Sequence, residues 1–208
     1  MLTRPWDVFY KESIGRILRE KREVIDIGGG LRIARDRSNR LDASHKWIRD
    51  LMEERQTSYK ILDYVPDFNP DIVGDVQDLP FPDGTQEAIV CNAVLEHVEN
   101  PIKAASEMHR VLKPGGYCFV YVPFLYYYHA EKGYYGDYWR FTEDSLRSIF
   151  KPFGSVSIQA VRGPLETLVR LSPLGRWRVF EHLGFLLDSL FKKHSSKQTS
   201  GYFVFLEK

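Results

Sequence analysis

The sequence predicts an α/β fold, built on a mainly parallel sheet with helices on both faces. Short apolar runs alternate with longer amphipathic segments along most of the 208 residues, and this is the pattern of strands joined by crossover helices. One apolar run, Val24–Ile27, leads directly into Gly28, Gly29 and Gly30. A turn of this kind at the carboxyl end of a strand is where open α/β sheets bind nucleotides.

The strands are expected at the short apolar runs, and the helices where apolar residues recur with helical spacing. The expected strands are Val24–Ile27, Tyr59–Leu62, Ile72–Gly74, Ala88–Asn92, Tyr117–Val122, Ser155–Val161 and Tyr202–Leu206. The expected helices are Val8–Glu20, Ser44–Arg55, Pro101–Leu112 and Glu143–Phe150. The third helix has the clearest limits, because Asn100 can cap its start and the Lys113–Gly116 turn can end it.

Two regions interrupt the simple alternation of strands and helices. Residues 124–141 form an aromatic stretch directly after a strand, and we expect it to be a substrate loop. Residues 162–194 are a largely helical insert, which Pro173 and Gly175 divide into two helices. We expect both regions to belong to a single domain that spans residues 1–208.

Composition narrows the function classes. Lys and Arg number 29 against 28 Asp and Glu, so the net charge is +1, and the basic excess of a nucleic-acid-binding protein is absent. Cys91 and Cys118 both lie in apolar stretches, which favours two buried thiols over a disulfide. No secretory signal or run long enough to span a bilayer is present, so we expect a cytoplasmic protein.

The glycine turn alone is a weak signal. The dinucleotide version needs Gly or Ala where Ile33 stands, and the Gly-Lys-Ser/Thr of a phosphate loop is absent. Asp26, two residues before the first glycine, suits a cationic ligand better than pyrophosphate. The residues that follow the other strands are more specific signals. Asp63 follows the second strand, where a carboxylate can accept hydrogen bonds from both ribose hydroxyls.

Taken in order, the motifs are DIGGG, the strand-end Asp63, GDVQDLPF, NAVLEHV and RVLKPGG. This order resembles the class I S-adenosylmethionine-dependent methyltransferases, in particular their common small-molecule group, and it covers Glu23 to about Phe124 closely. The resemblance implies a Rossmann-like sheet of seven strands with the last strand antiparallel. It also implies S-adenosylmethionine as the cofactor.

Carried over position by position, the resemblance implies how the cofactor is held. The glycines would pass beneath its methionine part, with one acid near the amino group, one at the ribose and one at the adenine edge. The glycines are Gly28, Gly29 and Gly30, and the acid near the amino group is Asp26. Asp63 would hold the ribose, and Asp75 with Val76 would lie at the adenine edge. Asn92 would lie beside the methionine carboxylate. Arg32 departs from the family pattern, because it replaces the usual third glycine.

The aromatic loop holds the candidate catalytic residues. His129 can serve as a base, with Asp137 and Arg140 as its partner and an anion clamp. The alternative is a packed loop in which Asp137 and Arg140 pair structurally. His97 is a second candidate, with a local hydrogen-bonding role as its alternative. None of the six histidines lies in an HExxH motif or a Cys/His cluster, so we expect no metal site.

The late insert carries an apolar stripe wider than one sheet edge requires, and residues 162–194 have six basic and three acidic side chains. Residues 165–191 are therefore interpreted as a lid, as a homodimer contact, or as an amphipathic element on anionic lipid.

We predict methyl transfer to a small-molecule or glycan-like acceptor, with oxygen favoured over nitrogen. The glycan-like acceptor comes from a weaker resemblance of the tyrosine-rich stretch and DYWRFT to methyltransferases of cell-surface polysaccharide pathways. The alternatives are an inactive S-adenosylmethionine-binding partner subunit and a protein or RNA methyltransferase.

Overall fold

A computed structural model describes residues 3–33 and 41–208, and its strands form one seven-stranded sheet in the order β3-β2-β1-β4-β5-β7-β6. The strands are β1 (Glu23–Ile27), β2 (Ser58–Asp63), β3 (Ile72–Val73), β4 (Gln86–Asn92), β5 (Leu112–Pro123), β6 (Ser155–Val161) and β7 (Gly201–Glu207). Strand β7 runs antiparallel to both of its neighbours, and β1 to β5 are parallel to one another. The predicted fold class is confirmed.

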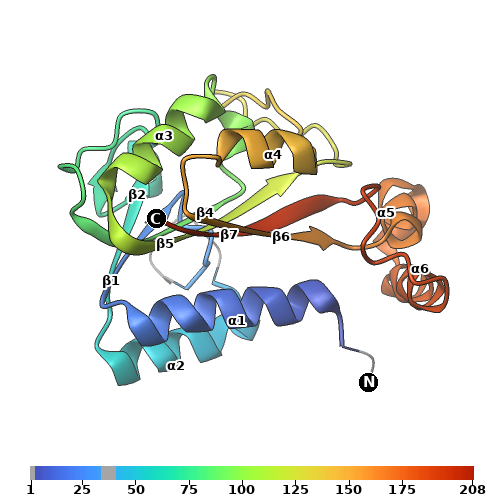
Figure 1. Ribbon diagram of the computed structural model, residues 1–208. Helices are drawn as coiled ribbons and strands as arrows, with labels where there is room; N and C mark the ends of the chain where they lie inside the picture. Colours follow the sequence, from blue (N-terminus) through green and yellow to red (C-terminus); the bar gives the residue numbers. More distant parts are fainter. Residues whose placement is uncertain (1–2, 34–40) are drawn as a thin grey trace.

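The helices lie on both faces of the sheet and at one end of it (Figure 1). They are α1 (Pro5–Glu20), α2 (Lys46–Arg55), α3 (Pro101–Val111), α4 (Glu143–Ile149), α5 (Pro164–Leu171) and α6 (Arg178–Leu190). Helices α1 and α2 cover one face, α3 and α4 cover the other, and α5 and α6 lie beyond the end where β6 and β7 meet them.

Strand β4 shows how the sheet divides the core. Ala88 and Val90 pack into the cluster that includes α1 and α2, whereas Ile89 and Cys91 pack into the cluster that includes α3. Successive side chains of a strand point to opposite faces, so an uninterrupted apolar strand requires cover on both sides. Cys91 and Cys118 are buried free thiols, as predicted.

The observed limits of the elements follow local signals, with several differences: α1 begins at Pro5, before the expected Val8, and β4 begins at Gln86, before the expected Ala88. The Asn100 side chain accepts from the Lys103 amide and caps α3, as predicted. Strand β5 begins at Leu112, earlier than expected, because the segment after α3 already pairs with β4. Helix α2 begins at Lys46, because residues 43–45 form a 3₁₀ turn capped by Asp42.

The aromatic loop, residues 124–141, contains no helix or strand, and its ends are fixed by backbone hydrogen bonds. The Phe124 amide donates to the Ser200 carbonyl at 2.9 Å, and the Phe141 amide donates to the Pro123 carbonyl at 3.0 Å. The loop therefore leaves β5 and returns to its end.

The helical insert comprises α5, a 3₁₀ turn and α6, so the predicted division at Pro173 and Gly175 is confirmed. The buried Asp188 of α6 accepts from the amides of Leu165 and Glu166 and so caps the start of α5. None of the helices among residues 3–33 and 41–208 is long and apolar enough to cross a membrane.

Candidate functional site

The glycine turn after β1 passes very close to β4. Gly28 and Gly29 have φ of 75° and 61°, in the left-handed region that glycine adopts freely. A Cβ atom on Gly30 would lie 2.4 Å from the Cβ atom of Asn92. Asn92 also donates from Nδ2 to the Gly30 carbonyl at 3.1 Å. Glycine is therefore required for the backbone to approach the end of β4.

Arg32, the departure from the family pattern, has φ of 52°. A glycine would adopt this left-handed conformation without strain, and a residue with a Cβ atom adopts it at a cost of about 1–2 kcal/mol. Position 32 therefore has a backbone conformation that favours glycine, although the residue at this position is arginine.

Asp26 lies beneath the turn and is fully buried. Its Oδ2 accepts from the Tyr59 hydroxyl at 2.6 Å and from the Leu31 amide at 3.0 Å. Burial raises the pKa of Asp26 to about 7. Its carboxyl group therefore holds the turn onto β2, and its predicted contact with the cofactor amino group stays a prediction.

A cavity of about 1070 Å³ lies at the carboxyl ends of the strands. Six of the eight predicted cofactor residues line it: Gly28, Gly30, Asp63, Asp75, Val76 and Asn92. Asp26 and Gly29 are not part of the lining. The order of the sheet thus gathers side chains that lie far apart in the sequence around one hollow.

The two acids of the lining are positioned by their own loops. The Asp63 Oδ1 accepts from the Val65 amide at 2.9 Å, and the Asp75 Oδ1 accepts from the Gln77 amide at 2.8 Å. Partial burial raises the pKa of Asp63. Each carboxylate is therefore held in place at the cavity wall before any ligand binds.

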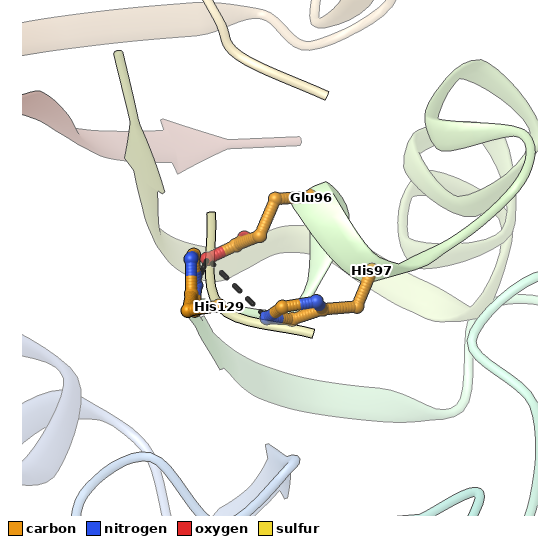
Figure 2. A group of neighbouring side chains, drawn as sticks. All are labelled: Glu96, His97 and His129. Carbon is orange, nitrogen blue, oxygen red and sulfur yellow. Dashed lines mark ion pairs between the residues drawn. The ribbon is translucent and has the colours of Figure 1, made fainter. Parts of the chain in front are cut away.

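Across the cavity from these acids, three titratable side chains meet: Glu96, His97 and His129. Figure 2 shows the two imidazole rings on either side of the Glu96 carboxylate. The Glu96 Oε1 lies 3.6 Å from the His129 Nε2 and 3.9 Å from the His97 Nε2. The Glu96 side chain is 1% exposed, and neither of its oxygens has a hydrogen-bond partner among the described residues.

Backbone carbonyls define the protonation of both rings. The His97 Nδ1 lies 2.6 Å from the Gly136 carbonyl, and the His129 Nδ1 lies 2.9 Å from the Tyr127 carbonyl. Because a carbonyl only accepts, each Nδ1 carries the hydrogen, and each neutral ring presents the Nε2 lone pair toward Glu96. The adjacent Glu96 carboxylate raises the pKa of His129.

The three predicted catalytic residues lie together, but in different roles. The Asp137 carboxylate accepts from the His129 amide at 2.8 Å and pairs with Arg140 at 2.6 and 2.7 Å. The remaining contacts of the Arg140 guanidinium are carbonyls of its own loop, with Tyr127 at 2.6 Å. Bonding to Arg140 lowers the pKa of Asp137.

His129 lines the cavity, whereas Asp137 and Arg140 do not. The contacts of Asp137 and Arg140 match the alternative that the sequence left open, in which these two residues pair with each other inside a packed loop. The predicted anion clamp at Arg140 has no geometric support.

In the part of the chain that the structure describes, four arginines line the cavity, Arg4, Arg32, Arg162 and Arg170, and the last two belong to the insert region. Arg162 follows β6, with its Nε 3.6 Å from Glu166, and Arg170 of α5 donates to Glu181 at 2.9 Å. Burial lowers the pKa of Arg162, and the charge of Arg170 adds to this effect. The helical insert therefore places two like charges at one end of the cavity.

The positions of Glu96, His97 and Arg162 after strand ends are a sequence signal that could have identified them as cavity residues. Glu96 and His97 follow β4, and Arg162 follows β6, which runs in the same direction as β5. Residues after the carboxyl ends of parallel strands collect at one edge. Arg170 had no comparable signal, because it lies inside a helix of the insert.

The comparisons with known proteins agree with this architecture. Residues 26–120 match a family model described as a methyltransferase domain. The chain is similar to a solved S-adenosylmethionine-dependent methyltransferase of Archaeoglobus fulgidus, at 16% identity, with a TM-score of 0.58 and coverage of 98% of this chain and 100% of that one. It is also similar to a putative sarcosine dimethylglycine methyltransferase of Galdieria sulphuraria, at 16% identity, with a TM-score of 0.52 and coverage of 98% and 83%.

The curated relatives match over a short segment. An uncharacterized methyltransferase of Schizosaccharomyces pombe is 44% identical over 45 residues, which is 22% of this chain and 16% of that protein. The chain thus spans less than a fifth of the length of the curated relatives it matches, since the other two matches cover 13% and 8% of their proteins.

The buried carboxyl of Asp26 predicts a dependence of stability on pH. The folded protein keeps this proton up to a pH of about 7, whereas an unfolded chain releases it near pH 3.9. The folded state therefore binds more protons in this window, and stability falls as pH rises through it, by up to about 1.4 kcal/mol per pH unit. Urea denaturation measures the free energy of unfolding at each pH. The decrease in this free energy between pH 5 and pH 8 should be smaller for Asp26→Asn than for the native protein.

Asp50→Asn is the matched control, because Asp50 lies on the exposed face of α2 and pairs only with Lys46 among the described residues. Its change in stability between the two pH values should equal that of the native protein. An equal loss in Asp26→Asn and the native protein would show that the Asp26 carboxyl is ionised throughout.

Proposed function

We propose that the chain, whose residues 26–120 match a methyltransferase domain, is a class I S-adenosylmethionine-dependent enzyme that transfers a methyl group from that cofactor to a small anionic or glycan-like acceptor. The single observation that carries this proposal is the lining of one cavity. It combines the glycine turn, Asp63 of β2 and Asp75 after β3 with Glu96, His129 and the arginines of the insert. We assign the former residues to the cofactor as the first part of the cavity, and the latter to the acceptor as the second part.

The residues of the first part fit the cofactor. The class I fold and the methyltransferase domain imply S-adenosylmethionine, and the cavity of about 1070 Å³ exceeds the volume that a ligand of this size needs. We propose that Gly28 and Gly30 hold its methionine part, with Asn92 beside the carboxylate. Asp63 would accept from the ribose hydroxyls, and Asp75 with Val76 would contact the adenine. When bound, the cofactor supplies a methyl group on a positively charged sulfur.

The second part is suited to an acceptor that carries negative charge. Arg162 and Arg170 each have one acidic partner, Glu166 and Glu181, and both still border the cavity. An anionic group between them would relieve the repulsion of two guanidinium groups in a partly buried site. Carboxylate, phosphate and sulfate groups, including those of acidic glycans, fit this chemistry.

Methyl transfer to a hydroxyl group requires loss of the hydroxyl proton. Glu96 and His129 both line the cavity, and the Glu96 Oε1 lies 3.6 Å from the His129 Nε2, so this pair is the one we propose for handling that proton. The protein's other contribution is to hold the acceptor atom in line with the methyl group, because correct orientation supplies a large part of the rate acceleration. A hydroxyl acceptor needs such a group more than an amine does, so the pair favours oxygen.

The helical insert borders the acceptor part through Arg162 and Arg170, which supports its interpretation as a wall or lid. The outer face of α6 carries exposed apolar side chains, among them Val179, Leu183 and Leu190 at 69, 50 and 72% exposure. The contact of this face with anionic lipid or with a second copy of the chain stays a prediction.

The alternative of a catalytically inactive cofactor-binding subunit depended on Arg32 at a glycine position. Arg32 has the left-handed backbone conformation that a glycine would adopt, which weakens this alternative. A protein or RNA acceptor remains less favoured than a small anion, since the net charge of +1 provides no general attraction for a polyanion.

Asp63→Ala should weaken binding of S-adenosylmethionine by about 1–3 kcal/mol, because a buried acceptor of hydrogen bonds is lost. Isothermal titration calorimetry measures this directly. Asp50→Ala on the exposed face of α2 is the control and should bind like the native protein. Absence of saturable binding to the native protein at millimolar cofactor would disprove the proposed function.

His129→Ala should lower kcat by roughly 10²–10⁴ while cofactor affinity stays near its native value. The assay follows labelled methyl groups from the cofactor into acceptor fractions of a cell extract. Arg140→Ala is the comparison, and it should lower the melting temperature, because Arg140 bonds Asp137 and the Tyr127 carbonyl. Retention of native kcat in His129→Ala would remove this residue from the proposed mechanism.

Arg170→Gln should raise the KM for the acceptor and leave the affinity for the cofactor unchanged, because its contact forms before the transition state. The label should also appear in the fraction of the extract that an anion exchanger retains. Arg178→Gln, at the exposed start of α6, is the matched control. Label confined to neutral or cationic products would contradict an anionic acceptor.

A further inference from the structure

We infer that Glu96, His97 and His129 form a binding site for one divalent transition-metal ion. The ligand atoms would be the Glu96 Oε1 and the two Nε2 atoms, which all lie within 4.8 Å of one another. This inference goes beyond methyl transfer, and it was not expected from the sequence, because the third ligand lies 32 residues from the nearest of the other two.

The separations between these atoms fit ligands of a shared ion. Distances of 3.6 and 3.9 Å from the Glu96 Oε1 to the two Nε2 atoms are too long for hydrogen bonds. Bonds of 2.0–2.2 Å in a tetrahedral site place neighbouring ligand atoms about 3.4 Å apart. The two pairs that involve Glu96 are therefore within a few tenths of an ångström of this separation, and the two Nε2 atoms lie within 4.8 Å of each other.

Both rings are oriented as metal ligands are. Each Nδ1 hydrogen is donated to a backbone carbonyl, that of Gly136 for His97 and that of Tyr127 for His129. Such an outer hydrogen bond holds a ligating histidine in the tautomer whose Nε2 lone pair is available. The Nε2 atoms then approach the same carboxylate oxygen from two sides (Figure 2).

The Glu96 carboxylate provides the second, independent observation. Its side chain is 1% exposed, and both oxygens lack a hydrogen-bond partner among the described residues. A buried negative charge without partners is costly, and a bound cation removes that cost. Asp137, by contrast, is similarly buried and has Arg140 as its partner.

The ligand set indicates the class of metal and its consequence. Two imidazoles with one carboxylate suit Zn²⁺, Co²⁺ or Fe²⁺ better than Mg²⁺ or Ca²⁺. Three protein ligands leave at least one coordination position, and His97 and His129 both line the cavity. Given the proposed function, an acceptor hydroxyl bound at that position would lose its proton more easily. With the ion bound, the Nε2 of His129 would be a ligand and not a base, so the ion would acidify the hydroxyl and its proton would pass to solvent water.

The ion would also fasten the aromatic loop, because His129 belongs to that loop and the other two ligands follow β4. A ligand that binds only the folded state raises the melting temperature. The full chain, freed of metal by dialysis against a chelator, should therefore bind one Zn²⁺ per chain in calorimetry and melt at a higher temperature with it.

Glu96→Gln, His97→Ala and His129→Ala should each lower the Zn²⁺ affinity by more than the roughly 10-fold that loss of an outer hydrogen bond costs. His182→Ala removes an exposed histidine of α6 and should leave the affinity unchanged. Titration of each variant with S-adenosylmethionine, whose proposed site is separate from these three ligands, shows that the variant is folded.

The Co²⁺-loaded protein should absorb with the visible bands of nitrogen and oxygen ligation. Absence of saturable Zn²⁺ binding, or unchanged affinity in Glu96→Gln and His97→Ala, would overturn the metal site and leave an ion pair of Glu96 with protonated His129. A thiolate band with Co²⁺ would also overturn it. Metal binding is measured without turnover, so its failure is distinguishable from failure of cofactor binding or methyl transfer.

Discussion

The parallel pairing of β1 with β2 and β4 is the constraint on which the site depends. The register places Ile27 beside both Leu62 and Cys91, so the three strands end together. The next residues of each strand, Gly28, Asp63 and Asn92, therefore reach the same edge of the sheet. A slip of one residue would turn every side chain of a strand to the other face and would separate the turn from Asn92.

Three buried carboxylates differ in the partners that surround them. Burial raises the pKa of Asp26 and of Glu166 to about 7, yet both have partners. Asp26 accepts from Tyr59, and Glu166 has an arginine within 3.3 Å. Glu96 is equally buried and faces only two imidazole nitrogens beyond hydrogen-bond distance. The buried carboxylate whose nearest partners are imidazoles thus lies where the cavity meets the aromatic loop.

The aromatic loop is held by backbone hydrogen bonds, by the ion pair of Asp137 with Arg140, and by side-chain bonds such as that of Trp139 to the Val98 carbonyl. The amides of Tyr138 and Trp139 donate to the Glu96 carbonyl at 2.8 and 3.2 Å. The same residue therefore supports the loop through its main chain and faces His129 through its side chain. Tyr128, at 77% exposure, is the most exposed ring of the loop and does not line the cavity, whereas Tyr126, Tyr134, Tyr135 and Tyr138 do.

The sequence by itself determined the strands, the glycine turn, the cap at Asn100 and six of the residues that line the cavity, because periodicity and turn chemistry act between residues that are close in the chain. Only the tertiary structure decided the surroundings of Arg140, Glu96 and the insert arginines. The partners of the last two come from distant segments: Glu96 meets His129 across the end of β4, and Arg162 bonds Ser200 beyond the whole insert. Strand register and the return paths of two long connections bring these groups together, and neither leaves a local pattern in the sequence.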